Sequence, residues 1–159
     1  MPSYLLGFLV LLAAFILQTT IAPHIDIRGV QPDFILIVVV TCAFIEGPAI
    51  GSVAGFFGGL LHDLVLTQIV GIHALCKTIV GYVAGLVERT IFAESIFLPM
   101  AAIFLASLLN QLIYAVVIFL LGYEVPFLMV LMTIVIPSAF YNSLLTPLVY
   151  PVVCRLATP

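Results

Sequence analysis

Charged side chains are scarce in this sequence. Asp, Glu, Lys and Arg make up 7% of the 159 residues, whereas about 25% is usual for a soluble globular domain. Only four residues are Lys or Arg and the net charge is −3, which excludes a nucleic-acid-binding surface and a polybasic lipid-binding patch. Hydrophobic residues reach 65%, and the mean hydropathy is +1.41. The composition therefore predicts a polytopic membrane protein in contact with membrane lipid.

Motifs of enzymes and metal sites are lacking as well. The chain contains no HExxH, no GxGD-type aspartyl pair of intramembrane proteases, no Ser–His pair at useful spacing and no DxxDG motif. His24, His62, Asp63 and His73 match no known spacing of zinc ligands. The three cysteines lie in apolar segments, where they act as small hydrophobic residues. The sequence thus predicts neither an enzyme nor a bound metal or cofactor.

Apolar segments follow one another with only short polar links, so residues 1–159 are expected to form a single integral-membrane domain. A helix rises about 1.5 Å per residue, and about 20 residues cross a hydrocarbon core of about 30 Å. Backbone groups in lipid must bond within their own helix. We therefore expect an all-α protein with six transmembrane helices, at about residues 4–22, 33–46, 48–66, 71–88, 96–121 and 127–154. The second is short for a span, and Pro137 and Pro147 predict a kink in the last.

The few loop charges bear on the orientation of the chain. Six spans place both termini on one side of the membrane, together with Arg89 and Arg155, and leave Arg28 on the other side. Because positively charged loops stay in the cytoplasm, this distribution favours cytoplasmic termini.

Glycines recur every four residues in the third and fourth segments, and residues at this spacing share one face of a helix. Such small residues let two membrane helices approach closely. One interpretation is that the two segments pack on each other. The other is that one stripe is left for a helix of another chain, including a second copy of this one. The residues concerned are Gly47, Gly51, Gly55, Gly59, Gly81 and Gly85.

Each stripe leads to polar residues close to the link between the two segments. Asp63 continues the first stripe, and His73 and Lys77 precede the second at the same spacing. Since a charge inside a membrane needs a partner or water, we predict a salt bridge between Asp63 and Lys77. The alternative is a polar cavity on the outer side, lined by Asp33, Asp63, His73 and Lys77, with a proton or ion relay as a third interpretation.

The last two segments carry polar residues in mid-span. The simplest interpretation is that they form interhelical hydrogen bonds, and the alternative is that they line the same cavity. They are Asn110, Gln111, Tyr141 and Asn142.

Several motifs, in order and spacing, resemble the bacterial rod shape-determining protein MreD family. The resemblance covers residues 18–89, and the six-span outline agrees over the whole chain. One departure is the link after Asp63, where the family often has a Ser-Gly-Gly-Pro-like turn and this chain has Val65-Leu66-Thr67-Gln68-Ile69. The matching motifs are Gln18-Thr19-Thr20, Gly29-Val30-Gln31-Pro32-Asp33-Phe34, Glu46-Gly47-Pro48, the segment 55–64, Gly71-Ile72-His73-Ala74-Leu75 and the segment 80–86.

The resemblance implies a non-enzymatic scaffold of the elongation machinery that builds sidewall peptidoglycan, located in the bacterial inner membrane. Its main partner would be MreC, a single-span protein with a large periplasmic domain, with links to the actin-like MreB and the cell-wall synthases. The fold of the family is similar to the six-helix substrate-binding component of energy-coupling-factor transporters. That similarity suggests the alternative function, a small-solute-binding membrane component of a transporter.

Overall fold

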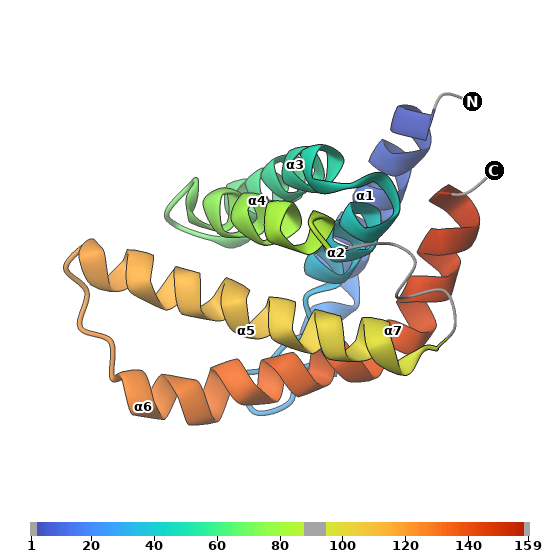
Figure 1. Ribbon diagram of the computed structural model, residues 1–159. Helices are drawn as coiled ribbons and strands as arrows, with labels where there is room; N and C mark the ends of the chain where they lie inside the picture. Colours follow the sequence, from blue (N-terminus) through green and yellow to red (C-terminus); the bar gives the residue numbers. More distant parts are fainter. Residues whose placement is uncertain (1–2, 88–94, 158–159) are drawn as a thin grey trace.

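A computed structural model describes residues 3–87 and 95–157 of the chain, and these residues form helices joined by links, with no β-strand among them (Figure 1). Arg89, which entered the prediction of topology, lies outside the described residues. The final helical stretch is continuous and consists of α6, a π-helical turn η3 and α7. The elements are α1 (Ser3–Thr20), the 3₁₀ turn η1 (Ala22–Ile25), α2 (Phe34–Glu46), α3 (Pro48–Leu66), α4 (Ile72–Gly85), α5 (Phe97–Leu120), α6 (Phe127–Val130), η3 (Leu131–Val135) and α7 (Ile136–Ala157).

Helix α2 is the core of the molecule. Its residues from Phe34 to Phe44 are all buried, and it contacts α1, α3, α4, α5 and α7. A helix that is apolar on every side is stable only when it is surrounded, and here the other helices surround it. The all-helical prediction is confirmed, and the six predicted segments correspond to five single helices and the continuous stretch α6–η3–α7.

Three of these helices are long and apolar enough to cross a membrane, namely α3, α5 and the stretch Phe127–Ala157. Helices α1, α2 and α4 are apolar but shorter. The 13 residues of α2 rise only about 20 Å, less than the hydrocarbon thickness. This length is compatible with a membrane because α2 faces other helices rather than lipid.

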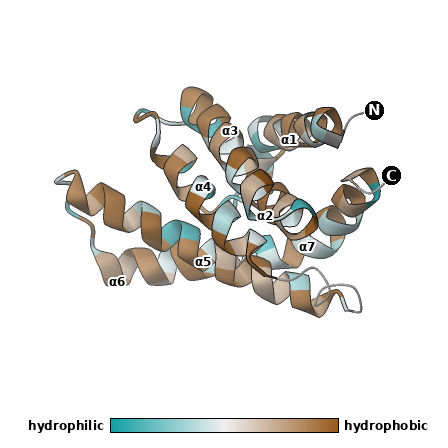
Figure 2. Cartoon of the chain, turned by 45° about the horizontal axis from the view of Figure 1, so that its top comes forward, coloured by the Kyte–Doolittle hydropathy of each residue, from teal (hydrophilic) through white to brown (hydrophobic). Residues whose placement is uncertain are grey.

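Apolar residues make up most of every helix, as the brown that dominates Figure 2 shows, and many of them face outward. Large side chains such as Phe57, Leu105, Leu144 and Leu148 are exposed. In a soluble protein these would be unfavourable, but lipid chains solvate them. The beginning of α1 and the end of α7 lie at one end of the bundle, and the α3–α4 and α5–α6 links lie at the opposite end (Figure 1).

Helices α3 and α4 form the closest helix pair, and the glycine stripes lie between them. A Cβ atom built on Gly51 would overlap the backbone of Gly81, and one built on Gly55 would overlap the carbonyl group of Lys77. Gly59 meets the backbone of His73 and Ala74 in the same way, while Gly85 meets Gly47 and Pro48. The faces of Gly51, Gly55, Gly59, Gly81 and Gly85 are thus occupied by contacts within the chain.

Gly47 itself has a separate role. It ends α2 with a φ of 92°, and Pro48 begins α3 immediately afterwards. A positive φ at this value is strained for residues with a side chain, so glycine permits the sharp reversal from α2 to α3.

The stretch α6–η3–α7 changes direction along its length. It runs beside α5 and then turns toward α1 in Figure 1. Pro147 and Pro151 lie inside α7, and Pro137 is the second residue of α7, just after the π-helical turn ends at Val135. Proline removes a helical hydrogen bond and π-helical turns disturb the regular ladder, which explains the bend that the sequence predicts.

We expect Gly55→Ala to destabilise the protein by roughly 3 kcal/mol, because its Cβ has to displace the Lys77 backbone. Gly7→Ala is the matched control, since a Cβ on Gly7 meets nothing within 4 Å. The chain has no Trp, so unfolding is best followed with a thiol-reactive fluorophore that labels the buried Cys42 and Cys76 as they become exposed. Equal melting temperatures for the two variants would contradict the close α3–α4 contact.

Candidate functional site

An ion pair lies at the N-terminal end of α2. The Lys77 Nζ atom of α4 donates to Asp33 Oδ2 at 2.7 Å. Lys77 is fully buried, and the side chain of Asp33 is 14% exposed. The other oxygen, Asp33 Oδ1, accepts from the backbone N–H of Leu36 at 2.9 Å, so Asp33 also caps α2. One carboxylate therefore neutralises a buried lysine and satisfies a free helix N–H group.

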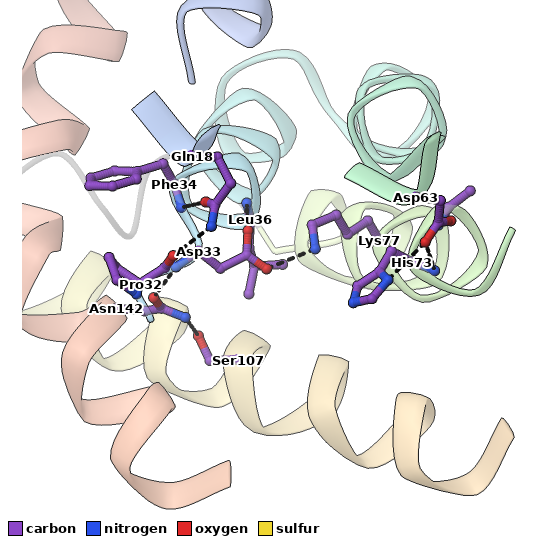
Figure 3. Close-up of polar contacts among 11 residues, drawn as sticks. Gln18, Pro32, Asp33, Phe34, Leu36, Asp63, His73, Lys77, Ser107 and Asn142 are labelled. Atoms are coloured by element: carbon purple, nitrogen blue, oxygen red, sulfur yellow. Dashed lines mark hydrogen bonds and ion pairs between the residues drawn. The ribbon is translucent and has the colours of Figure 1, made fainter. Parts of the chain in front are cut away.

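Two amide side chains complete the polar shell around this helix end (Figure 3). Gln18 of α1 donates to the carbonyl of Pro32 at 2.9 Å and accepts from the N–H of Phe34 at 2.8 Å. Asn142 of α7 accepts from the N–H of Asp33 at 2.8 Å and donates to Ser107 Oγ of α5 at 3.0 Å. Each free backbone group that these contacts reach is thereby satisfied inside the protein, as a low-dielectric interior requires.

Asp63 forms a second polar centre, at the N-terminal end of α4. Its Oδ1 atom lies 2.8 Å from Nδ1 of His73 and accepts from the His73 N–H at 3.2 Å. Its Oδ2 atom accepts from the N–H groups of Gly71 at 2.9 Å and Ala74 at 3.0 Å. A carboxylate at a helix N-terminus is favoured by the helix dipole and by the free N–H groups. Asp63, which is fully buried, therefore caps α4 from the neighbouring helix.

The predicted salt bridge between Asp63 and Lys77 is wrong. Each residue pairs elsewhere, Asp63 with His73 and Lys77 with Asp33. Both residues lie near the α3–α4 link, but the free N–H groups at the start of α4 attract the Asp63 carboxylate. Lys77 is reached instead by Asp33, from the N-terminal end of α2.

A cavity of about 400 Å³ adjoins both centres. Its walls come from the ends of α1 and α3, from α4, α5 and α7, from η3 and from the α1–α2 link. His62 and His73 lie on this wall with their rings stacked, 4.2 Å between centroids, and His73 also contacts Tyr114 at 4.8 Å. The lining residues are Gln18, Pro23, Gly29, Val30, Gln31, Pro32, Asp33, His62, Leu66, His73, Asn110, Gln111, Ile134 and Ser138.

The four polar residues predicted in mid-span divide into two kinds. Tyr141 donates to the carbonyl of Ile25 at 2.6 Å, and Asn142 makes the contacts given above. Asn110 and Gln111 line the cavity instead, and the Oδ1 atom of Asn110 has no hydrogen-bond partner. For Asn110 Oδ1, the prediction of an interhelical hydrogen bond is therefore wrong.

Of the four residues predicted to form a polar cluster, Asp33 and His73 line the cavity, whereas Asp63 and Lys77 lie behind it as their partners. Sequence reasoning missed the roles of Gln18 and Ser107. Gln18 is 4% exposed and bonds to the backbone on both sides of the start of α2. The signals in the sequence were its place in the motif Gln18-Thr19-Thr20 and its position before a proline-containing link. Within residues 3–87 and 95–157, no group of three His, Cys, Asp or Glu side chains is placed to hold a metal ion.

Comparison with known proteins identifies a family. The family model described as rod shape-determining protein MreD matches residues 2–158, almost the entire chain. No curated protein and no solved structure matches it. The family model therefore includes the C-terminal half, which the sequence motifs did not cover.

The Asp33–Lys77 ion pair predicts that removing both charges restores the stability lost when only the lysine is removed. Lys77→Met leaves the Asp33 carboxylate without its cation, and we expect a loss of about 3 kcal/mol of stability. Adding Asp33→Asn removes the stranded charge and keeps a side-chain oxygen for the N–H of Leu36, because Asn caps helices as well as Asp. The double variant should recover most of the melting temperature in the thiol-labelling assay. A double variant as unstable as Lys77→Met alone would show that the pair is not the reason for the loss.

For Asp63 we expect that neutralising the carboxylate lowers stability and that a change at Lys77 does not restore it. No lysine pairs with Asp63. Asp63→Asn turns one of two accepting oxygens into a donor facing N–H groups, so we expect a loss of roughly 2–4 kcal/mol. Faster hydrogen exchange at the amides of Gly71 and Ala74 should accompany it. The double variant Asp63→Lys/Lys77→Asp should be no more stable than the single variants. Recovery of stability in the double variant would instead support a direct Asp63–Lys77 salt bridge.

Proposed function

Because the chain belongs to the MreD family of rod shape-determining proteins, we propose that it is a non-enzymatic scaffold of the cell-elongation machinery in the bacterial inner membrane. Membership of the family assigns it a role in rod shape determination. In the proposed role it binds MreC as its main partner and helps to regulate sidewall peptidoglycan synthesis. MreB and the cell-wall synthases would be further members of the same assembly, and a homodimer is compatible with it. The observation that carries the proposal is the family match over residues 2–158.

The distribution of polar and apolar surface supports a scaffold that works within the bilayer. The α3–α4 link contains five residues, from Thr67 to Gly71, and the α5–α6 link contains six, from Leu121 to Pro126. Links of this size offer little surface to a soluble partner. Large apolar side chains are exposed along the helices instead, and packing between such faces drives association of membrane helices.

The occupied glycine stripe restricts where a partner helix binds. Gly51, Gly55 and Gly59 contact the backbone of α4, so substitutions there act on the fold before they act on a complex. We therefore place the partner contact on the exposed apolar faces of other helices, and not between α3 and α4.

The orientation follows the same proposal. With both termini in the cytoplasm, the end of the bundle that holds the α3–α4 and α5–α6 links faces outward (Figure 1). Leu66 and His73, which flank the α3–α4 link, then place the cavity toward the outer side.

The test is co-purification with the MreC protein of the same bacterium after detergent extraction. We expect the native chain to retain MreC and the less stable Lys77→Met variant to retain less of it. The double variant Asp33→Asn/Lys77→Met should recover both the stability and the bound MreC. An unrelated six-span protein with the same tag serves as the control. A chain that accumulates normally but recovers no MreC, in cells that stay rod-shaped after its depletion, would refute the scaffold.

A further inference from the structure

Asn110 and Asn142 are buried to similar extents but differ in their hydrogen bonds. Both lie in membrane helices, with exposed fractions of 3% and 1%. Asn142 uses its amide oxygen and its amide nitrogen within the protein. The amide oxygen of Asn110 has no partner, although leaving a buried acceptor unsatisfied costs about 1–3 kcal/mol. The burial of Asn142 is thus explained by its hydrogen bonds within the protein, whereas the burial of the Asn110 amide oxygen needs a different explanation.

A second unpartnered polar atom lies on the same cavity. The Nδ1 atom of His62 is buried and has no hydrogen-bond partner. His62 belongs to α3 and Asn110 to α5, and both residues line the cavity of about 400 Å³. Two residues of one cavity wall therefore each carry a buried side-chain atom that the chain leaves unsatisfied. The adjoining space can hold a molecule from outside the chain that supplies the missing hydrogen bonds.

The charges around the cavity indicate what kind of molecule that partner is. Asp33 is the one acidic residue on the described wall, and Lys77 neutralises it from behind. His73 is engaged by Asp63. Apart from His62 and Asn110, the other polar side chains of the wall are uncharged amides and a hydroxyl, on Gln18, Gln31, Gln111 and Ser138. Such a wall has no excess charge to offer an ion, and it suits a molecule that both donates and accepts hydrogen bonds.

The surroundings are suited to binding in two further ways. The volume is within the range of small-molecule sites, about 300–1,000 Å³. The π-helical turn η3 borders the cavity through Ile134, and π-helical turns occur often at functional sites. A turn of this kind at the wall provides a place where α6 can adjust around a ligand.

We propose that this cavity binds an uncharged molecule of sugar size, whose hydroxyl or amide N–H groups donate to Asn110 Oδ1 and whose polar groups also reach His62 Nδ1. The molecule is either a free solute or the uncharged headgroup of a lipid, since both present the same chemistry. This inference does not rest on the binding of MreC, and a scaffold that lost MreC would still contain the site.

The experiment measures binding to the purified full chain in detergent and in lipid nanodiscs. The uncharged probes are glucose, N-acetylglucosamine and myo-inositol, and the charged probes of similar size are glucosamine and gluconate. Unfolding is followed by thiol labelling of Cys42 and Cys76. Saturating ligand should raise the melting temperature by at least about 2 °C, and equilibrium dialysis should give one bound molecule per chain. Nanodiscs with a monoglucosyl lipid distinguish a headgroup from a free solute.

Two matched substitutions separate a binding role from a structural one. Asn110→Leu should leave the melting temperature of the ligand-free protein unchanged or raise it, because it removes an unsatisfied acceptor, and it should abolish the response to the probe. Asn142→Leu should lower the melting temperature, because it strands the N–H of Asp33. His62→Phe keeps a ring to stack on His73 and should weaken probe binding at least tenfold.

Three results would overturn the proposal. The first is that no uncharged probe, free or lipid-borne, binds or raises the melting temperature, which would leave a cavity that holds only water. The second is tighter binding of glucosamine or gluconate than of glucose. The third is a loss of stability in Asn110→Leu as large as that in Asn142→Leu, which would make Asn110 a structural residue.

Discussion

The structure depends on satisfying the N-terminal end of α2, a helix that begins inside the protein. The first N–H groups of a helix have no partner within it, and an apolar medium offers no water to bind them. Gln18, Asp33 and Asn142 supply the missing acceptors from three different elements. Lys77 then neutralises the acceptor that carries a charge. Helices α1, α4 and α7 are therefore fixed around α2 by hydrogen bonds of specific geometry, while apolar packing alone would leave their rotation and depth less defined.

The close contact of α3 with α4 determines where these polar groups lie. With Gly55 against the Lys77 backbone and Gly59 against His73 and Ala74, the two helix axes have little freedom to slide. That register brings the Asp63 carboxylate to the first N–H groups of α4 and directs Lys77 toward Asp33. The two aspartates thus perform the same physical task at different helix ends, and each is held by a different cation or ring. The glycines are required because only a helix face without side chains permits this approach.

Much of this arrangement follows from the sequence. Apolar segments predicted the helices, because lipid and a buried core both demand internal backbone bonds, and the four-residue period of Gly51, Gly55 and Gly59 singled out the closest face. The partners of Asp63 and Lys77 could not be predicted, since a carboxylate near a helix start has backbone N–H groups as well as side chains to choose from. Which partner each residue takes depends on where α2 begins in space. The amides of Gln18 and Asn142, from distant parts of the chain, fix that position by hydrogen bonds to the start of α2.

The satisfied and unsatisfied polar groups divide the interior into two parts with different functions. Around α2, each amide and carboxylate named above is matched, which gives the bundle one defined arrangement. A few residues away, Asn110 Oδ1 and His62 Nδ1 remain unmatched on the wall of a cavity. A protein that satisfies Asn142 so fully gains nothing structural from an unsatisfied Asn110, and a Leu at that position would avoid the cost of burying an amide. The explanation that we propose is a bound molecule that supplies the missing hydrogen bonds at the cavity.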